Sequence, residues 1–203
     1  ALPSIIKLFR EKYPEVRLSL YQGSPSRIVE MACSGEADIA IATEATSLTK
    51  DLAMLPCYQW NRCVLTPPRH PLLKSKNLSL EEICSYPIIT YDFTHTGRPI
   101  IKQTFEASGL EPDIILTAVD ADVIKTYVEL GLGIGIVSMM AYDPVRDTKI
   151  RGMDASHLFE PSTTGIGIRK NTYMRGYIYD FISMFAPHLT RSAVDAIVSK
   201  QVR

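Results

Sequence analysis

The fold is decided by residues 16–43, which read VRLSLYQGSPSRIVEMACSGEADIAIAT. Apolar and polar residues alternate at 16–20, and this pattern predicts a half-buried strand. Ser24-Pro25 then supplies a cap and a first-turn proline for a helix, which Gly35 ends. Residues 38–43 (DIAIAT) follow as a second, short buried strand. Strand, helix and strand in this order predict a βαβ unit, and such units build parallel sheets.

The same alternation of elements continues on both sides of this stretch. A helix is predicted from Pro3 to just before Pro14, and Ser79 with Glu82 forms a capping box for another short helix. The remaining expected strands are 52–56, 63–66, 88–91, 113–118, 134–137, 150–153 and 165–168, and the remaining expected helices are 98–108, 122–130, 173–185 and 190–200. The first two of these strands would cross between two lobes. We therefore expect an α/β fold of two Rossmann-like lobes joined by crossover strands, with residues 1–57 plus 163–203 in lobe I and 58–162 in lobe II.

Composition excludes several classes of protein. The 22 basic and 22 acidic side chains cancel to a net charge of zero, so the chain lacks the basic excess that attracts a phosphate backbone. No apolar run approaches the roughly 20 residues that a membrane span needs. The four cysteines show no CxxC spacing, which favours small core residues in a reducing compartment over a redox role. We expect a soluble, cytoplasmic protein without membrane contact.

The motifs that suggest catalysis have simpler interpretations. Gly131-x-Gly133-x-Gly135 lacks the third glycine of a dinucleotide fingerprint, and it follows a helix and precedes a strand, which is the reverse of the required order. Asp120 and Asp122 could form a carboxylate pair, but their place before a helical run favours helix caps. The histidines and cysteines have no metal-ligand spacing. We therefore expect no enzyme, no catalytic residue, no metal and no cofactor.

Hydroxyl side chains at the predicted strand ends are the remaining candidates for binding. Ser24, Thr43, Thr94 and Thr96 all follow a strand and several of them precede a helix. Free N–H groups at helix N-termini together with hydroxyl donors can hold an oxyanion. The alternative is that these residues are ordinary N-caps. Trp60, the single tryptophan, is either a packing residue near the crossover or a ligand contact.

Several stretches resemble the effector-binding domain of LysR-type transcriptional regulators. They are QGSP (22–25), GEADIAI (35–41) and LGLGIG (130–135). More specific stretches resemble the branch of this family formed by cysteine-regulon activators and their sulfate-starvation paralogues, and the paralogues more than the activators. These are IATEA (41–45), LPCYQWNR (55–62), TGR (96–98), DADVIKTY (120–127), YDFI (179–182) and FAPHLTR (185–191). The resemblance covers essentially the whole chain.

The resemblance implies a fold like that of type 2 periplasmic binding proteins. It also implies that a first strand, a Thr-x-Thr-Gln loop and a winged helix-turn-helix domain precede Ala1 in the full-length protein. That protein would be a homotetramer on promoter DNA, with a dimer of this domain, and would activate genes of cysteine biosynthesis and organosulfur use.

In this branch sulfate occupies the interlobe cleft of the related domain. Thr43, Trp60 and Thr96 match its anion-contacting threonines and tryptophan, so the resemblance implies that they bind the effector. The resemblance to the sulfate-starvation paralogue suggests adenosine 5′-phosphosulfate as that effector, with sulfate and thiosulfate as simpler occupants. Two alternatives share the fold, namely a periplasmic solute-binding protein for an anion and a cleft enzyme similar to prephenate dehydratase.

Overall fold

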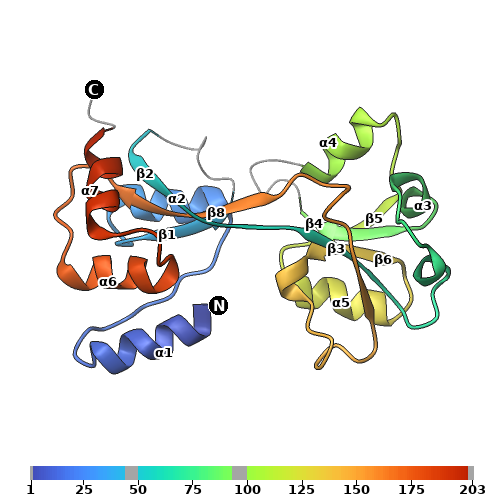
Figure 1. The fold of residues 1–203 in the computed structure, drawn as a ribbon, viewed down its shortest axis with the longest axis horizontal. Helices are drawn as coiled ribbons and strands as arrows, with labels where there is room; N and C mark the ends of the chain where they lie inside the picture. The colour runs from blue at the N-terminus through green and yellow to red at the C-terminus, as the bar shows by residue number, and fades with distance from the viewer. Residues whose placement is uncertain (1, 44–49, 93–99, 201–203) are drawn as a thin grey trace. The chain divides into compact units, whose positions relative to one another are not determined.

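The chain forms two compact units, each with its own sheet and its own core (Figure 1). The computed structural model describes residues 2–43, 50–92 and 100–200. Unit 1 comprises residues 1–58 and 163–203, and unit 2 comprises residues 59–162. The chain therefore passes from one unit to the other twice, at residues 58–59 and again at residues 162–163.

Unit 1 is built on a three-stranded sheet with the order β1-β8-β2. Its elements are α1 (Leu2–Lys12), α2 (Pro25–Ser34), β1 (Ala40–Thr43), most of β2 (Leu52–Trp60), most of β8 (Ser162–Arg169), α6 (Gly176–Phe185) and α7 (Arg191–Lys200). Strands β1 and β8 are antiparallel, and their register places Thr43 opposite Thr164. The strand predicted at 52–56 is longer than expected, since β2 continues to Trp60.

Helices cover both faces of this sheet. Helix α2 packs on one face, where Val29 and Ala32 join the buried side chains of Ala40, Ala42 and Leu52. Helices α1, α6 and α7 form the larger core on the opposite face, which includes the buried residues Phe9, Leu55, Ile166, Ile168, Phe181, Ile182 and Phe185. Small residues alternate with isoleucines along β1 and β8. The small side chains suit the smaller core under α2, and the isoleucines suit the larger core on the opposite face.

The strand predicted at 16–20 is wrong, because these residues form no strand in the part of the chain that the structure describes. Val16 and Leu18 are half-buried against the larger core of unit 1, while Arg17 and Ser19 are exposed. The alternation therefore indicates the core-facing side chains of Val16 and Leu18, whereas Leu20 is 66% exposed. A strand also needs a partner ladder, and none of the described strands pairs with this segment. The predicted parallel βαβ unit is replaced by an extended segment, α2, and a strand paired antiparallel.

Unit 2 is built on a five-stranded mixed sheet with the order β5-β4-β6-β3-β7. Its elements are β3 (Arg62–Thr66), a 3-10 helix (Pro71–Lys74), α3 (Leu80–Cys84), β4 (Ile88–Tyr91), α4 (Ile100–Ala107), β5 (Ile114–Ala118), α5 (Ala121–Glu129), β6 (Ile134–Ser138), a second 3-10 helix (Met139–Ala141) and β7 (Arg151–Asp154). Strand β4 is parallel to both β5 and β6, while β3 is antiparallel to β6 and β7. The expectation of parallel pairing is thus confirmed in this unit.

Local sequence signals place the ends of the helices correctly. Ser24 caps α2 and Gly35 ends it with a φ of 84°. Ser79 caps α3 in the predicted capping box. Gly131 follows α5 with a φ of 77°, a left-handed conformation that favours glycine. A Cβ on Gly133 would lie 2.5 Å from the carbonyl oxygen of Pro87, so this glycine is required for close strand packing.

Two hydrophobic cores lie on opposite faces of the unit 2 sheet. Helix α5 contributes Ile124 and Val128 to one core, and α3 and α4 contribute Ile83, Ile101 and Phe105 to the other. The prediction for the cysteines is confirmed for Cys57 and Cys63, which are buried, while Cys33 and Cys84 are half-buried; all four are free thiols. Among the described residues no helix is long and apolar enough to cross a bilayer.

Candidate functional site

The first candidate residue, Thr43, ends β1 in unit 1 and is half-buried. Its Oγ1 lies 3.1 Å from Oγ1 of Thr164, which is buried on the neighbouring strand β8. In a hydrogen bond between two hydroxyls one donates and the other accepts, so the accepting hydroxyl keeps its own proton for a further partner. When Thr164 donates, the hydroxyl of Thr43 keeps its proton for a further acceptor at the end of β1.

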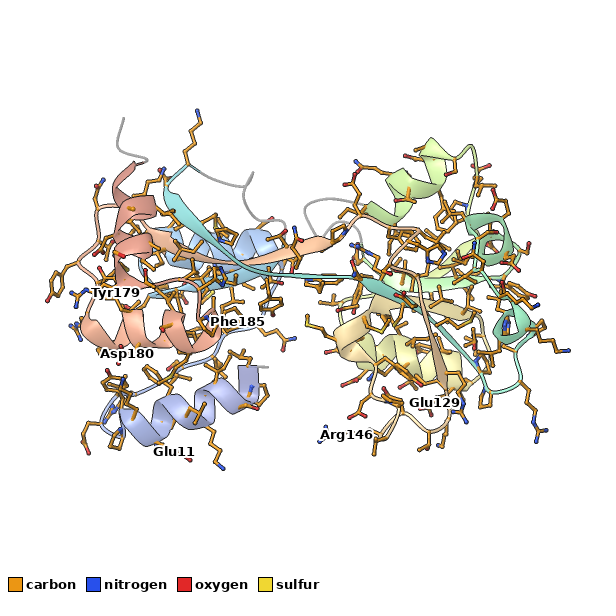
Figure 2. All side chains as sticks on the ribbon, in the orientation of Figure 1. Glu11, Glu129, Arg146, Tyr179, Asp180 and Phe185 are labelled. Atoms are coloured by element: carbon orange, nitrogen blue, oxygen red, sulfur yellow. The ribbon has the colours of Figure 1, made fainter. Side chains whose placement is uncertain are left out.

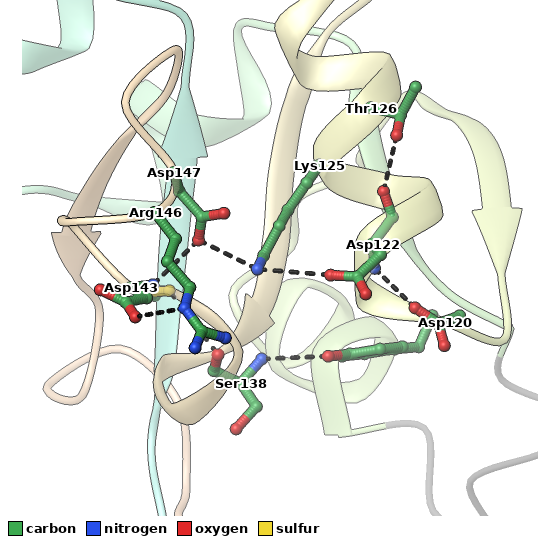
Figure 3. Close-up of polar contacts among 10 residues, drawn as sticks. Asp120, Asp122, Lys125, Thr126, Ser138, Asp143, Arg146 and Asp147 are labelled. Carbon is green, nitrogen blue, oxygen red and sulfur yellow. Dashed lines mark hydrogen bonds and ion pairs between the residues drawn. The ribbon is translucent and has the colours of Figure 1, made fainter.

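Ser24 and Asp120 serve as helix caps, as the N-cap interpretation of each residue predicted. The hydroxyl of Ser24 accepts from the N–H of Arg27 at 3.3 Å. The carboxylate of Asp120 accepts from the N–H of Asp122 at 2.6 Å and so places a negative charge at the N-terminus of α5 (Figure 3). A helix N-terminus that already holds a carboxylate is a poor place for a second anion. Asp120 therefore contributes no donor to an anion site, and Ser24 is accounted for as an N-cap.

The second candidate, Trp60, is the last residue of β2 and belongs to unit 2. Its indole is partly exposed, and the guanidinium carbon of Arg62 lies 5.1 Å from the ring centroid. This distance is typical of a cation–π contact, in which the aromatic face is attracted to a positive charge. One face of the indole thus packs on a protein cation.

Arg62 is a residue that the sequence reasoning missed. It is only 7% exposed, although it carries a permanent charge. Its Nη1 donates to the carbonyl oxygen of Glu160 at 2.9 Å, and its Nη2 donates to Oγ of Ser162 at 2.7 Å. The strand expected at 63–66 does not include Arg62, and only the structure shows that Arg62 opens the strand RCVLT (62–66), in which every residue is buried. A charged residue in such a strand must find fixed partners.

The third candidate, Thr96, lies outside the described residues, as do Thr94 and Gly97. The described part of unit 2 nearby ends with Asp92 after β4 and resumes with Ile100, the first residue of α4.

The carboxyl end of the unit 2 sheet carries an ionic network (Figure 3). Nζ of Lys125 on α5 lies 2.9 Å from the carboxylate of Asp147 and 3.4 Å from that of Asp122. The N–H of Asp143 also donates to Asp147 at 2.9 Å. Because Lys125 and Asp147 are only 13% and 15% exposed, the network holds the segment after β6 against α5. It is a structural feature of the helix and loop.

Three buried or half-buried titratable groups, one in unit 1 and two in unit 2, are poorly suited to acid–base chemistry. Burial raises the pKa of Tyr91 to about 12, and its hydroxyl oxygen accepts from the N–H of Ser138 at 3.4 Å. Burial likewise raises the pKa of Cys63 to about 12 and that of Cys57 to about 11. All three groups stay protonated near neutral pH, so none is an activated base or nucleophile. The described residues contain no cluster of three or more metal-ligating side chains.

A second polar cluster lies in unit 1, where α1 packs on α6. The carboxylate of Asp180 accepts hydrogen bonds from Lys12 and Tyr13, on the face of α6 that is turned toward α1 (Figure 2). A shallow hollow beside it is also lined by Tyr179, Ser183, Thr190 and Arg191. Because both donors at the end of α1 are directed at Asp180, the cluster fastens α1 to α6.

Comparison with known proteins identifies the family. The LysR substrate binding domain family matches residues 1–190. The regulator SsuR of Burkholderia cenocepacia is 52% identical over 202 residues, which cover 100% of this chain and 66% of that protein. CysB of Haemophilus influenzae is 51% identical, covering 96% of this chain and 60% of that protein. Cbl of Escherichia coli is 42% identical, covering 91% and 58%. The chain thus spans less than two thirds of the length of these relatives.

Solved structures agree with this assignment. The cofactor-binding domain of the Cbl transcriptional regulator superposes with a TM-score of 0.92 at 40% identity, covering 98% of this chain and 87% of that domain. The effector-binding domain of QuiR, solved with shikimate, has the same fold at 18% identity and a TM-score of 0.79. The fold is therefore that of type 2 periplasmic binding proteins, as expected, and the named relatives are transcriptional regulators rather than enzymes. The chain belongs to the LysR substrate-binding domain family, among the effector-binding domains of CysB, Cbl and SsuR regulators.

Proposed function

We propose that this domain senses a small sulfur-pathway anion and controls transcription through a DNA-binding domain elsewhere in the full-length protein. The proposed effector is adenosine 5′-phosphosulfate, with sulfate and thiosulfate as simpler ligands. Thr43, Trp60 and Thr96 are the proposed contacts. The observation that carries the proposal is the Thr43–Thr164 hydroxyl pair at the end of β1, in a chain whose relatives regulate transcription.

The proposed contacts suit an oxyanion. Hydroxyl and indole N–H groups donate hydrogen bonds to sulfate oxygens without adding a mobile counter-charge. Thr43 belongs to unit 1 and Trp60 to unit 2. A ligand shifts the equilibrium between two states of a protein only by its differential affinity for them, typically about 1–3 kcal/mol in allosteric proteins.

The remaining parts of the proposal concern the full-length protein. We propose that it is a homotetramer built on a dimer of this domain, that it acts on promoter DNA in the cytoplasm, and that it activates sulfur-assimilation or organosulfur genes. The zero net charge of this chain supports a sensor whose DNA contacts are made by another domain.

Calorimetric titration tests the proposal. Adenosine 5′-phosphosulfate, sulfate and O-acetylserine are titrated into the chain and into variants Thr43→Val and Thr96→Val. Valine keeps the shape and removes the hydroxyl, so affinity for the anion should fall by about 0.5–1.5 kcal/mol or more. Thr117→Val, on the exposed side of β5, is the matched control and should bind as the parent chain does. Unchanged affinity in Thr43→Val would remove this residue from the site, and no binding of any of the three ligands would contradict the proposed effector class.

A further inference from the structure

We propose that Arg62 is a positioning residue, which fixes the indole of Trp60 in the orientation that the effector meets. The inference rests on the proposed function, because the proposed effector is the ligand that contacts the fixed indole. It uses only contacts within unit 2, to which Trp60, Arg62, Glu160 and Ser162 all belong.

The guanidinium of Arg62 is fixed at two points. One nitrogen donates to the carbonyl oxygen of Glu160 and another to Oγ of Ser162, at 2.9 and 2.7 Å. A guanidinium is planar, so two bonds from different nitrogens define the plane of the whole group. The Ser162 side chain is fully buried and Arg62 is 7% exposed, so water does not compete strongly for these bonds. The cation is thus held in one orientation.

The fixed plane then orients the indole. The ring of Trp60 lies 5.1 Å from the guanidinium carbon, within the range of a cation–π contact. Trp60 is at the end of β2, where an aromatic side chain has fewer neighbours than in a core. Packing on an immobile cation restricts the indole ring before the effector binds. The complex then loses less free energy to the ordering of this side chain. Such preorganisation raises affinity because less side-chain entropy is lost in the complex.

The four residues lie next to the two points at which the chain enters and leaves unit 2. Trp60 and Arg62 follow directly after the chain enters unit 2, and Glu160 and Ser162 directly precede its exit. Arg62 therefore fastens the entering segment to the leaving segment inside unit 2. An effector that touches Trp60 therefore contacts a side chain that packs on Arg62, the residue that joins the two segments.

Lysine cannot replace arginine in this role. Its ammonium keeps the charge, but its three donors share one nitrogen and it has no plane on which an indole can pack. Arg62→Lys therefore separates orientation from charge. Ser162→Ala is a milder change, because it removes one acceptor and leaves both Arg62 and Trp60 in place.

Fluorescence reads the orientation of this one residue, because Trp60 is the only tryptophan in the chain. We expect Arg62→Lys to shift the native emission to longer wavelength and to increase quenching by acrylamide, and Ser162→Ala to do so to a lesser extent. The matched control is Arg146→Lys, also in unit 2, whose side chain is 87% exposed and pairs with Asp143. It should leave both readouts unchanged. Circular dichroism and the urea midpoint verify that each variant is folded.

Anion titration supplies the second readout. Where the parent chain binds thiosulfate or sulfate, the affinity of Arg62→Lys should be about tenfold lower, which corresponds to about 1.4 kcal/mol. Parent-like emission and quenching in both Arg62→Lys and Ser162→Ala would overturn the inference, and so would altered quenching with unchanged anion affinity. If Arg62→Lys does not fold, Ser162→Ala decides by the same two readouts.

The outcome also separates this inference from the proposed function. A parent chain that binds none of the tested anions would contradict the proposed effector class. Increased quenching of Trp60 in Arg62→Lys would still support Arg62 as the residue that fixes the indole, whereas parent-like quenching would overturn it.

Discussion

Replacing Asp147 by asparagine tests the ionic network of unit 2 (Figure 3). The substitution keeps the shape of the side chain and removes its charge. The partner of Lys125 at 2.9 Å then carries no charge, and the remaining carboxylate beside Lys125 is that of Asp122, which lies 3.4 Å away and is 88% exposed. The bond from the N–H of Asp143 can persist, because an amide oxygen also accepts. The variant therefore isolates the charge of the pair.

The degree of burial sets the expected magnitude. Exposed ion pairs contribute about 0.2–1 kcal/mol, whereas removing one partner of a fully buried pair costs about 3–5 kcal/mol. Lys125 and Asp147 are 13% and 15% exposed and thus lie between these limits. We expect Asp147→Asn to lower the free energy of unfolding by about 1–2 kcal/mol. Lys125→Met should cost a similar amount, and the double variant should cost less than the sum of the two.

The pH dependence of this effect has a definite sign. Burial alone would raise the pKa of Asp147, but the N–H of Asp143 and the ammonium of Lys125 together hold the pKa below its usual value. A group whose pKa is lower in the folded state contributes stability above its unfolded pKa, which is about 3.9. That contribution is lost as the pH falls through the folded value. The difference between parent and Asp147→Asn should therefore be constant from pH 7 to about pH 5 and shrink below about pH 4.

Urea unfolding followed by Trp60 fluorescence measures these differences within unit 2. The single variants, the double variant and the parent form a double-mutant cycle. A coupling energy below about 0.5 kcal/mol would show that the pair behaves as an exposed one and would refute the reasoning from burial. A stability difference that stays constant down to pH 3 would refute the assigned pKa direction.

Three further predictions concern packing, capping and thiol reactivity. Gly133→Ala places a Cβ 2.5 Å from the carbonyl oxygen of Pro87, so thermal unfolding should show a loss of about 1–3 kcal/mol. Ser79→Ala removes the N-cap of α3 and should cost about 1 kcal/mol in urea unfolding. Cys57 and Cys63 have pKa values raised to about 11 and about 12 by burial, so a thiol reagent at pH 8 should not label them in the native chain.

The packing and thiol predictions each have an internal control. Gly176→Ala should be neutral or stabilising, because a Cβ there meets no atom within 4 Å and alanine favours the helix it begins. Equal losses in Gly133→Ala and Gly176→Ala would contradict the packing argument. Cys33 and Cys84 are less buried and should react before the other two thiols. Labelling of all four at one rate would contradict the assigned burial.

Most helix boundaries could be predicted because their signals are local. Ser24-Pro25 with Gly35, and Ser79 with Glu82, satisfy backbone groups within a few residues of themselves. No distant part of the fold is needed to interpret them. The same holds for Asp120, which caps α5.

What could not be predicted depends on distant partners. The alternation at 16–20 correctly places Val16 and Leu18 toward the core but not Leu20, which is 66% exposed, and a strand also needs a neighbour that the pattern does not specify. Arg62 finds its acceptors at Glu160 and Ser162, about a hundred positions along the chain. Its role becomes visible only when the fold brings β3 beside the segment that leaves unit 2.

The most direct test of the central claim is a titration of the chain with adenosine 5′-phosphosulfate, followed by the fluorescence of Trp60. We expect a saturable change that sulfate reverses by competition. Adenosine 5′-phosphate, which lacks the sulfo group, should change the signal far less at equal concentration. A response that is equal for both nucleotides and unaffected by sulfate, or no saturable response at all, would contradict the claim that this domain senses a sulfur-pathway anion through Trp60.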